Sequence, residues 1–297
     1  MTINRVDVAN NSDFSVMANN LFAKKLQNEV PENFTEFVDN YFQQYPLDEL
    51  EGQSWDDLFG CVYGWWEFIQ NHDLQHGKVK VFNPNLEQHG WLSSHTVIAV
   101  LQRDMPFLVS SMRMEINRRN IALHTIKSTI FAIHRNEKNE LIEIHSGSEL
   151  QNSELPRETL VYLEVNLHTS EEELQELATA LESVLAEVEV AVGSYHSLLK
   201  LAGEVSDDLS LSQTKEAVKG KLTDKSVSKK SMTVNGDALK NSQDFLQWMI
   251  NGHFTFLGYC EYDLVEKNGN KKLVENVKQR KGVASLLKEK ERTIEFD

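Results

Sequence analysis

The sequence predicts an α+β fold, in which an N-terminal helical segment precedes an antiparallel sheet with helices on one face in the ferredoxin-like order. Three observations predict it. An apolar stretch at 96–101 leads through a proline turn into a helical pattern. Alternating apolar residues at 161–167 precede a long helical stripe. Before residue 78, large aromatic residues recur at helical spacing.

Residues 96–120 predict a buried strand, a tight turn and a helix. The strand at 96–101 is apolar on both faces, which is typical of a central strand covered on two sides. We expect Asp104 to cap the helix, because its carboxylate can accept hydrogen bonds from the first backbone N–H groups. Pro106 would lie in the first turn, where its missing N–H costs nothing, and an apolar stripe starts at Leu108.

Residues 1–90 form the predicted helical segment. Pro31 is expected to begin a helix that ends at Pro46, and a further helix is expected from Ser54 to Asn71. Aromatic residues follow one face of each helix and could be mistaken for a ligand cage. At helical spacing they are far more typical of helix–helix packing, so we interpret them as core.

The remaining elements complete the sheet. A strand at 121–135 is expected to turn back at 136–140 into a short strand, and a further strand at 161–167 should place alternate residues, including Leu167, inward. A capping box at Ser170 then begins a long helix that we expect to end before Gly203. Strand, helix, strand, hairpin, strand, helix is the ferredoxin-like order.

Composition changes after this sheet. The predicted sheet domain covers 91–204, and the Ser, Lys, Thr and Asp residues of 205–236 indicate a flexible linker. In 237–297 a helix and a hairpin with Asn268–Gly269 at its turn indicate the beginning of a second domain. Because this domain is too short to complete a sheet, we expect the chain to be a fragment.

Charge and hydropathy exclude several function classes. The chain of 297 residues has a net charge of −15; residues 1–204 hold 31 acidic and 14 basic residues, and 205–297 hold 14 and 16. An acidic first part repels phosphate backbones, which disfavours nucleic-acid binding. No apolar run is long enough to cross a bilayer and no signal peptide is recognisable, so we expect a cytoplasmic protein without membrane contact.

Few residues point to chemistry in this chain. No glycine-rich turn for a dinucleotide or phosphate is present, and no nucleophile with its base is recognisable. His72 and His76 have the spacing of a helical metal site, but Gly77 predicts that the helix ends there. Cys61 and Cys260 lie far apart and are interpreted as small apolar residues. We therefore expect no catalytic, cofactor-binding or metal-binding residue here.

Several blocks of sequence carry a resemblance to a known family. They look like the N-terminal region of the large bacterial NAD-specific glutamate dehydrogenases, in order on both sides of the expected linker. The blocks are Val81-Phe82-Asn83-Pro84, Gly90-Trp91, His95-Thr96-Val97, residues 104–109, residues 113–119 and residues 252–259.

The resemblance implies a much longer polypeptide with ACT-like domains before a catalytic domain. That absent domain would use NAD to convert L-glutamate and water to 2-oxoglutarate and ammonia, with formation of NADH. The segment itself would be ACT-like, bind no cofactor, and serve allosteric regulation and assembly of a homo-oligomer in amino-acid catabolism, with an amino acid as a possible effector.

The possible regulatory turn consists of Arg103, Asp104, Pro106 and Phe107. Amino-acid-binding ACT domains tend to have glycine where Phe107 stands, so this bulky side chain is expected to obstruct a ligand, and a purely structural turn is favoured. The alternative to a dehydrogenase segment is a free-standing ACT-like amino-acid-sensing module, since fold alone does not fix function. Whether the reading frame continues past Asp297 into a dehydrogenase domain separates the two.

Overall fold

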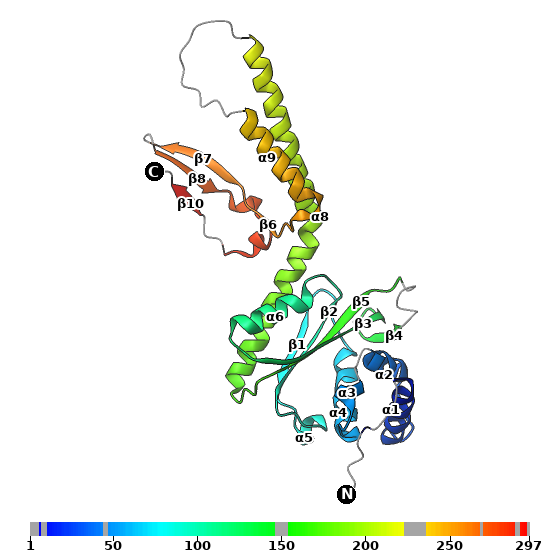
Figure 1. Cartoon of the computed structure of the whole chain (residues 1–297). Helices are drawn as coiled ribbons and strands as arrows, with labels where there is room; N and C mark the ends of the chain where they lie inside the picture. Colours follow the sequence, from blue (N-terminus) through cyan, green and yellow to red (C-terminus); the bar gives the residue numbers. More distant parts are fainter. Residues whose placement is uncertain are drawn as a thin grey trace. The chain divides into compact units, whose positions relative to one another are not determined.

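The structure, a computed structural model, describes residues 6, 11–43, 47–145, 154–222, 236–267, 270–288 and 292–295. The chain forms two compact units, residues 1–188 and 189–297, which we describe separately. The predicted α+β class is confirmed: helices come first, followed by an antiparallel sheet with further helices (Figure 1).

Four helices form the N-terminal part of the first unit: α1 (Asn11–Lys25), α2 (Phe34–Gln43), α3 (Leu47–Leu50) and α4 (Trp55–Ile69). The expectation for α4 is confirmed, and Ser54 caps it by accepting hydrogen bonds from the N–H groups of Asp56 and Asp57. The expected start of α2 at Pro31 is wrong, since the helix begins at Phe34 after a turn. Pro46 lies outside the described residues.

The sheet of the first unit has five antiparallel strands in the order β1-β2-β5-β3-β4. Their bounds are Lys78–Phe82 (β1), Thr96–Arg103 (β2), Leu123–Arg135 (β3), Leu141–His145 (β4) and Arg157–Val165 (β5), with the short helix α5 (Leu86–His89) after β1. In the ferredoxin-like order the strand beside β2 would follow the last helix. Here β1, which precedes β2 in the chain, occupies that edge.

Helices cover both faces of this sheet (Figure 1). On one face, α6 (Leu108–Arg118) and the first part of α8 (Glu171–Leu222) pack against alternate residues of β2 and β5. On the other face, α1, α2 and α4 pack against the intervening residues, and the rings of Phe37 and Phe131 stack 5.3 Å apart. The helices α1, α2 and α4 therefore share one core with the sheet.

The strand β5 ends earlier than its sequence pattern indicates. Leu160 to Leu163 are all buried because both faces of the strand are covered, so the alternation in the sequence does not separate a buried face from an exposed one. Leu167 lies beyond the end of β5 and is 50% exposed, so its expected inward position is wrong.

The helix α8 is longer than expected. It passes Gly203 and continues to Leu222, so residues 205–222 are helical and not part of a linker. Residues 223–235 lie outside the described part of the chain. A single glycine costs a helix only about 1 kcal/mol relative to alanine, and good helix formers such as Ala, Lys and Leu follow it.

The second unit contains α9 (Gly236–Trp248), the π-helical turn η1 (Met249–His253) and a three-stranded sheet in the order β10-β8-β7. The strands are β7 (Tyr262–Lys267), β8 (Asn270–Glu275) and β10 (Thr293–Glu295). A two-stranded pair joins β6 (Gly258–Tyr259) to β9 (Lys281–Gly282), and the short helices η2 (Val277–Gln279) and η3 (Val283–Leu286) complete the unit. The expected hairpin is confirmed, since Lys267 pairs with Asn270, although its two turn residues lie outside the described part.

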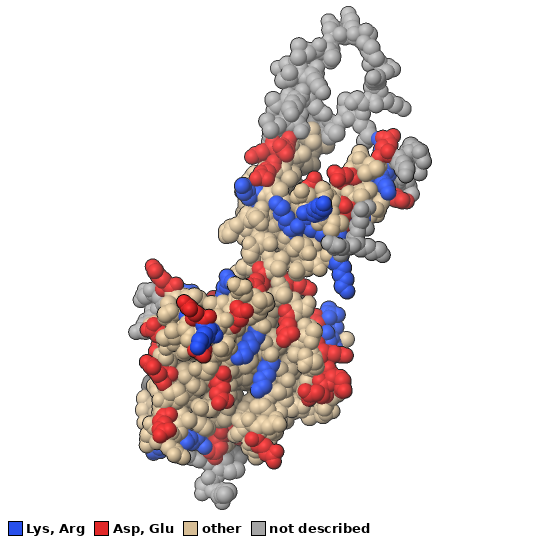
Figure 2. All heavy atoms as spheres, turned by 180° about the vertical axis from the view of Figure 1, so that it is seen from behind, with Lys and Arg blue, Asp and Glu red and all other residues tan. Residues whose placement is uncertain are grey.

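Acidic and basic side chains are interspersed on the surface of the first unit that Figure 2 shows, and no continuous basic surface appears on that face. Across the described ranges, no helix combines the length and the apolar character needed to span a membrane.

Candidate functional site

The predicted turn follows the end of β2, and Asp104 does not cap the helix. Its backbone N–H donates to the carbonyl of Arg157 at 2.8 Å, and its Oδ1 accepts a hydrogen bond from the Thr159 hydroxyl at 2.9 Å. The helix α6 begins only at Leu108, too far along the chain for this carboxylate to reach its first N–H groups. The capping prediction is therefore wrong, and Asp104 instead joins β2 to β5.

Phe107 occupies the N-cap position of α6 in the left-handed region, at φ 70° and ψ −4°, without a side-chain cap. For a residue with a Cβ this conformation is about 1–2 kcal/mol less favourable than the right-handed helical one, whereas glycine adopts it without this cost. The residue is 52% exposed. Arg103, Asp104, Pro106 and Phe107 are thus brought together in one turn, and their regulatory role stays a prediction.

A buried ionic cluster lies at the end of the sheet near this turn, and sequence reasoning missed it. The carboxylate of Glu158, fully buried on β5, lies 2.7 Å from Nδ1 of His72 and accepts hydrogen bonds from Arg135 Nε and Nη2 at 2.6 and 2.9 Å. Burial raises the pKa of the Glu158 carboxyl, but the hydrogen bonds from His72 and Arg135 outweigh this effect, so the pKa lies below its ordinary value.

Arg135 of this cluster and the neighbouring Lys78 also connect the C-terminal end of α4 to the sheet through hydrogen bonds. Arg135 Nη2 donates to the carbonyl of Ile69 at 2.9 Å, and Lys78 Nζ donates to the carbonyl of Phe68 at 2.6 Å. These carbonyls have no partner within the helix, and positive charge offsets the negative end of the helix dipole. His72 and His76 do not share a helix; Nε2 of His72 lies 3.0 Å from the carbonyl oxygen of His76.

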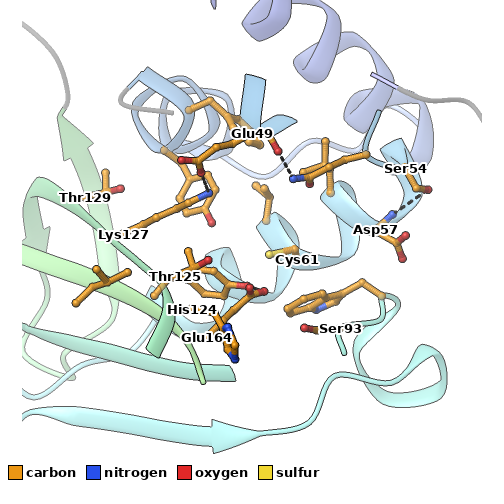
Figure 3. A pocket seen from close by; sticks show the side chains of 18 of the residues that line it. Glu49, Ser54, Asp57, Cys61, Ser93, His124, Thr125, Lys127, Thr129 and Glu164 are labelled. Atoms are coloured by element: carbon orange, nitrogen blue, oxygen red, sulfur yellow. Dashed lines mark hydrogen bonds and ion pairs between the residues drawn. The ribbon is translucent and has the colours of Figure 1, made fainter. Parts of the chain in front are cut away.

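A cavity of about 930 Å³ lies between α4 and the face of the sheet that the N-terminal helices cover (Figure 3). Its walls come from α2, α3, α4, the loop before β2, and strands β3 and β5. Small-molecule sites typically enclose about 300–1,000 Å³, so the volume is in the range of a binding pocket.

Opposite charges project into this cavity from neighbouring strands. On β3, Lys127 Nζ pairs with Glu49 Oε2 at 2.7 Å. On β5, Glu164 accepts a hydrogen bond from the Tyr162 hydroxyl and lies 3.5 Å from Nδ1 of His95. The cavity lining thus carries the carboxylates of Glu49, Asp57 and Glu164 and the ammonium group of Lys127, so acidic side chains outnumber basic ones.

Cys61 on α4 faces the same space (Figure 3). Burial raises the pKa of its thiol to about 12, and a hydrogen bond from Trp65 Nε1, 3.1 Å from Sγ, lowers it only in part. Glu164 raises this pKa and Lys127 lowers it, so both charges lie close enough to act on the thiol. A thiol with this pKa stays protonated at neutral pH and is a poor nucleophile.

The part of the chain that holds the turn, the buried cluster and the cavity matches a known protein family. Residues 37–181 match the protein family described as "Glutamate dehydrogenase, ACT1 domain". The match covers just under half of the chain, and we call residues 37–181 the ACT1 domain. The ACT1 domain begins within α2 and ends within α8, so it contains the sheet, the turn at 103–107, the buried cluster and all residues that line the cavity.

Two curated relatives extend the likeness beyond the ACT1 domain. The chain is 32% identical over 281 residues to an NAD-specific glutamate dehydrogenase of Pseudomonas aeruginosa, covering 94% of this chain and 16% of that protein. It is 36% identical over 237 residues to an NAD-specific glutamate dehydrogenase of Halomonas elongata, covering 80% of this chain and 14% of the relative. The chain thus spans about a sixth of the length of these relatives.

The sequence did contain a signal for the cavity. Thr125, Lys127 and Thr129 alternate along β3 on the face that packs toward the N-terminal helices, where apolar residues are expected in a closed core. The buried cluster had no comparable signal, because His72, Arg135 and Glu158 are far apart in the chain. In the part of the chain that the structure describes, no three metal-ligating side chains come together.

Proposed function

We propose that the chain is the N-terminal regulatory and assembly segment of an NAD-dependent glutamate dehydrogenase. The observation that carries the proposal is the ACT1 match over residues 37–181 within a chain that aligns over 94% of its length with a far longer NAD-specific glutamate dehydrogenase. In the complete enzyme, L-glutamate, NAD and water would react to 2-oxoglutarate, ammonia and NADH. Catalysis and NAD binding would use residues outside this chain.

The proposal includes a cytoplasmic homo-oligomer and an amino-acid effector. Residues 237–297 would begin a second ACT-like domain, which the antiparallel β10-β8-β7 sheet following α9 supports. The turn of Arg103, Asp104, Pro106 and Phe107 would be a regulatory or subunit contact, since it lies at an exposed end of the ACT1 sheet.

Two measurements test the proposal. The purified chain is expected to produce no NADH from glutamate and NAD. In the complete protein encoded by the same reading frame, removal of residues 1–188, the first compact unit, is expected to abolish the response to amino acids or to reduce the number of subunits per oligomer, calculated from the mass measured by light scattering.

Three results would contradict the proposal. NADH formation by the chain alone would place catalysis within it. An unchanged number of subunits together with an unchanged amino-acid response after the deletion would contradict both the regulatory and the assembly role. A reading frame without a dehydrogenase domain would favour the free-standing amino-acid-sensing module instead.

A further inference from the structure

The strand β3 has one edge that is only partly covered. It pairs with β5 along most of its length, but with β4 only from Ala132 to Arg135. Next to β4, Nδ2 of Asn40 donates a hydrogen bond to the carbonyl of Ile130 at 3.1 Å. Along residues 124–129, no strand of the described part of the chain pairs with the side of β3 that faces away from β5. Such an open edge presents unpaired backbone groups to other extended segments.

The register of β3 shows which backbone groups face the open edge. The N–H of Ile133 donates to the carbonyl of Pro156, which precedes β5, so Ile133 faces the β5 side. The N–H and C=O of one strand residue point to the same side, and that side alternates along the strand. Ile126 and Ser128 therefore direct their N–H and C=O groups away from β5, toward the open edge.

The cavity between α4 and the sheet borders this open edge. Six consecutive residues of β3, 124–129, line it. A cavity over one face of a strand would be lined by every second residue, such as Thr125 and Lys127. Ile126 and Ser128, whose side chains lie on the other face, line it as well, so the edge between the two faces borders the cavity. The volume of about 930 Å³ is sufficient for a short peptide segment.

The charge of the cavity favours a basic partner. The lysine in its lining, Lys127, pairs with Glu49, whereas the carboxylates of Asp57 and Glu164 add negative charge (Figure 3). Charges of opposite sign across an interface increase the rate and the specificity of association. A strand added at this edge would therefore direct basic side chains into the cavity.

The opposite face of β3 favours apolar side chains. Ile126 and Ile130 are half-buried there, and Ile126 packs against the core that α6 and α8 cover. Because successive side chains of a strand point to opposite faces, one added strand would meet both environments. The matching sequence alternates basic and apolar residues.

A second copy of the chain fits this edge less well than a basic peptide. Residues 1–204 hold 31 acidic and 14 basic residues, so the first units of two copies repel each other at low ionic strength. The same charge attracts a basic segment. Net charge therefore favours a different polypeptide.

We propose that the open edge of β3 binds an extended segment of another protein in which basic and apolar residues alternate. The segment adds a strand beside Ile126 and Ser128, with its basic side chains toward Asp57 and Glu164. In strand addition the main-chain hydrogen bonds give affinity, and the alternate side chains give specificity. This inference does not rest on the proposed function, because the whole edge lies within this chain.

The test measures the binding of two synthetic peptides to the 297-residue chain by calorimetry. The basic peptide is acetyl-Val-Lys-Val-Lys-Val-amide, and in its acidic analogue glutamate replaces lysine. The basic peptide is expected to bind at least about tenfold more tightly, because only its charges complement the cavity. Its binding should also slow the hydrogen exchange of the Ile126 and Ser128 amides, since these N–H groups gain a partner.

Variants separate the backbone contact from the charge contact. Ser128→Pro removes the N–H at the open edge and keeps the pairing with β5, as prolines on edge strands do. It should weaken the basic peptide by at least about tenfold, whereas Ser128→Ala, which keeps the N–H, should not. Asp57→Asn and Glu164→Gln should each weaken it severalfold, whereas Glu143→Gln, outside the cavity lining, should not. Thermal melting checks the fold of each variant, and the exchange of the Ser128 amide in the wild type does not depend on any variant.

The proposal is overturned if neither peptide binds, if both bind equally, or if a folded Ser128→Pro variant binds the basic peptide as tightly as the wild type. A dimer in light scattering that Ser128→Pro dissociates would assign the edge to a second copy instead. Binding of the basic peptide by this chain but not by the complete protein would show that another part of the same polypeptide covers the edge, which also overturns a separate partner. The proposed function is tested by other measurements and is unaffected by these results.

Discussion

Replacing Glu158 by glutamine should destabilise the first unit by about 3–5 kcal/mol, the usual cost of breaking a buried ion pair from one side. The glutamine has the shape of the glutamate but no charge. In the wild type, nitrogen atoms of His72 and Arg135 lie 2.6–2.9 Å from the carboxylate oxygens. The amide N–H₂ of the glutamine would face one of these N–H donors and could not accept its hydrogen bond. The Arg135 side chain is 4% exposed, so water cannot replace the lost partner.

Urea denaturation followed by tryptophan fluorescence measures this cost. Four of the five tryptophans lie in the first unit, so the signal reports mainly on its unfolding. Glu143→Gln is the matched control: this glutamate is 51% exposed and pairs with His145, so the free energy of unfolding should change by less than about 0.5 kcal/mol. A second variant, Glu158→Met combined with Arg135→Met, should cost less than the sum of the single changes, because it leaves no unpaired charge.

The dependence on pH gives an independent check. The pKa of Glu158 is lower in the folded than in the unfolded chain, so its contribution to stability is present above the ordinary carboxyl pKa and is lost as the pH falls below it. The difference in stability between wild type and Glu158→Gln should therefore shrink in acid. A loss no larger than that of Glu143→Gln at neutral pH would refute the role of the cluster in holding α4 on the sheet.

Three further predictions concern α6 and the turn before it. Phe107→Gly should be more stable than Phe107→Ala by about 1 kcal/mol in thermal or urea unfolding, because both lose the ring and only alanine keeps a Cβ at positive φ; equal stability would show that the backbone is not strained. Asp104→Ala should cost about 1–3 kcal/mol by leaving the buried Thr159 hydroxyl without its acceptor, whereas Asp104→Asn keeps that acceptor and most of the stability; similar losses in both would contradict this role. Hydrogen bonds from Arg118 lower the pKa of Glu115 to about 2, so between about pH 5 and pH 2 the wild type should lose more stability than Glu115→Gln, and parallel pH profiles would count against it.

The local sequence pattern was sufficient to predict most of the individual helices, strands and turns. The apolar run of β2, the helical stripe that follows Ser54 and the polar turn between β3 and β4 each depend on residues within a few positions of one another, and all three predictions are confirmed. The family resemblance could likewise be recognised from the sequence, because short blocks such as Val81-Phe82-Asn83-Pro84 carry it without reference to the fold.

Asp104 shows where local reasoning fails. An aspartate shortly before a helix is a frequent cap, and Asp104 fits that rule in sequence. The rule does not say that Thr159, 55 residues later, comes to lie beside it when β2 pairs with β5. Strand pairing brings the partner of Asp104 to it, and the residues around Asp104 do not show which strand will pair with β2.

The sequence by itself determined the class of fold, the succession of most of its elements and the resemblance to the glutamate dehydrogenases. Only the tertiary structure decided that β1 closes the edge beside β2, that the N-terminal helices cover the second face, and that Glu158 meets Arg135 and His72. The position of the charged residues in the cavity was likewise decided only by the tertiary structure. Lys127 and Glu164 lie 37 positions apart, and the register of β3 against β5 alone makes them neighbours. Helical and strand periodicity depends on neighbours in the chain, whereas register, burial and charge pairing depend on which distant segments meet.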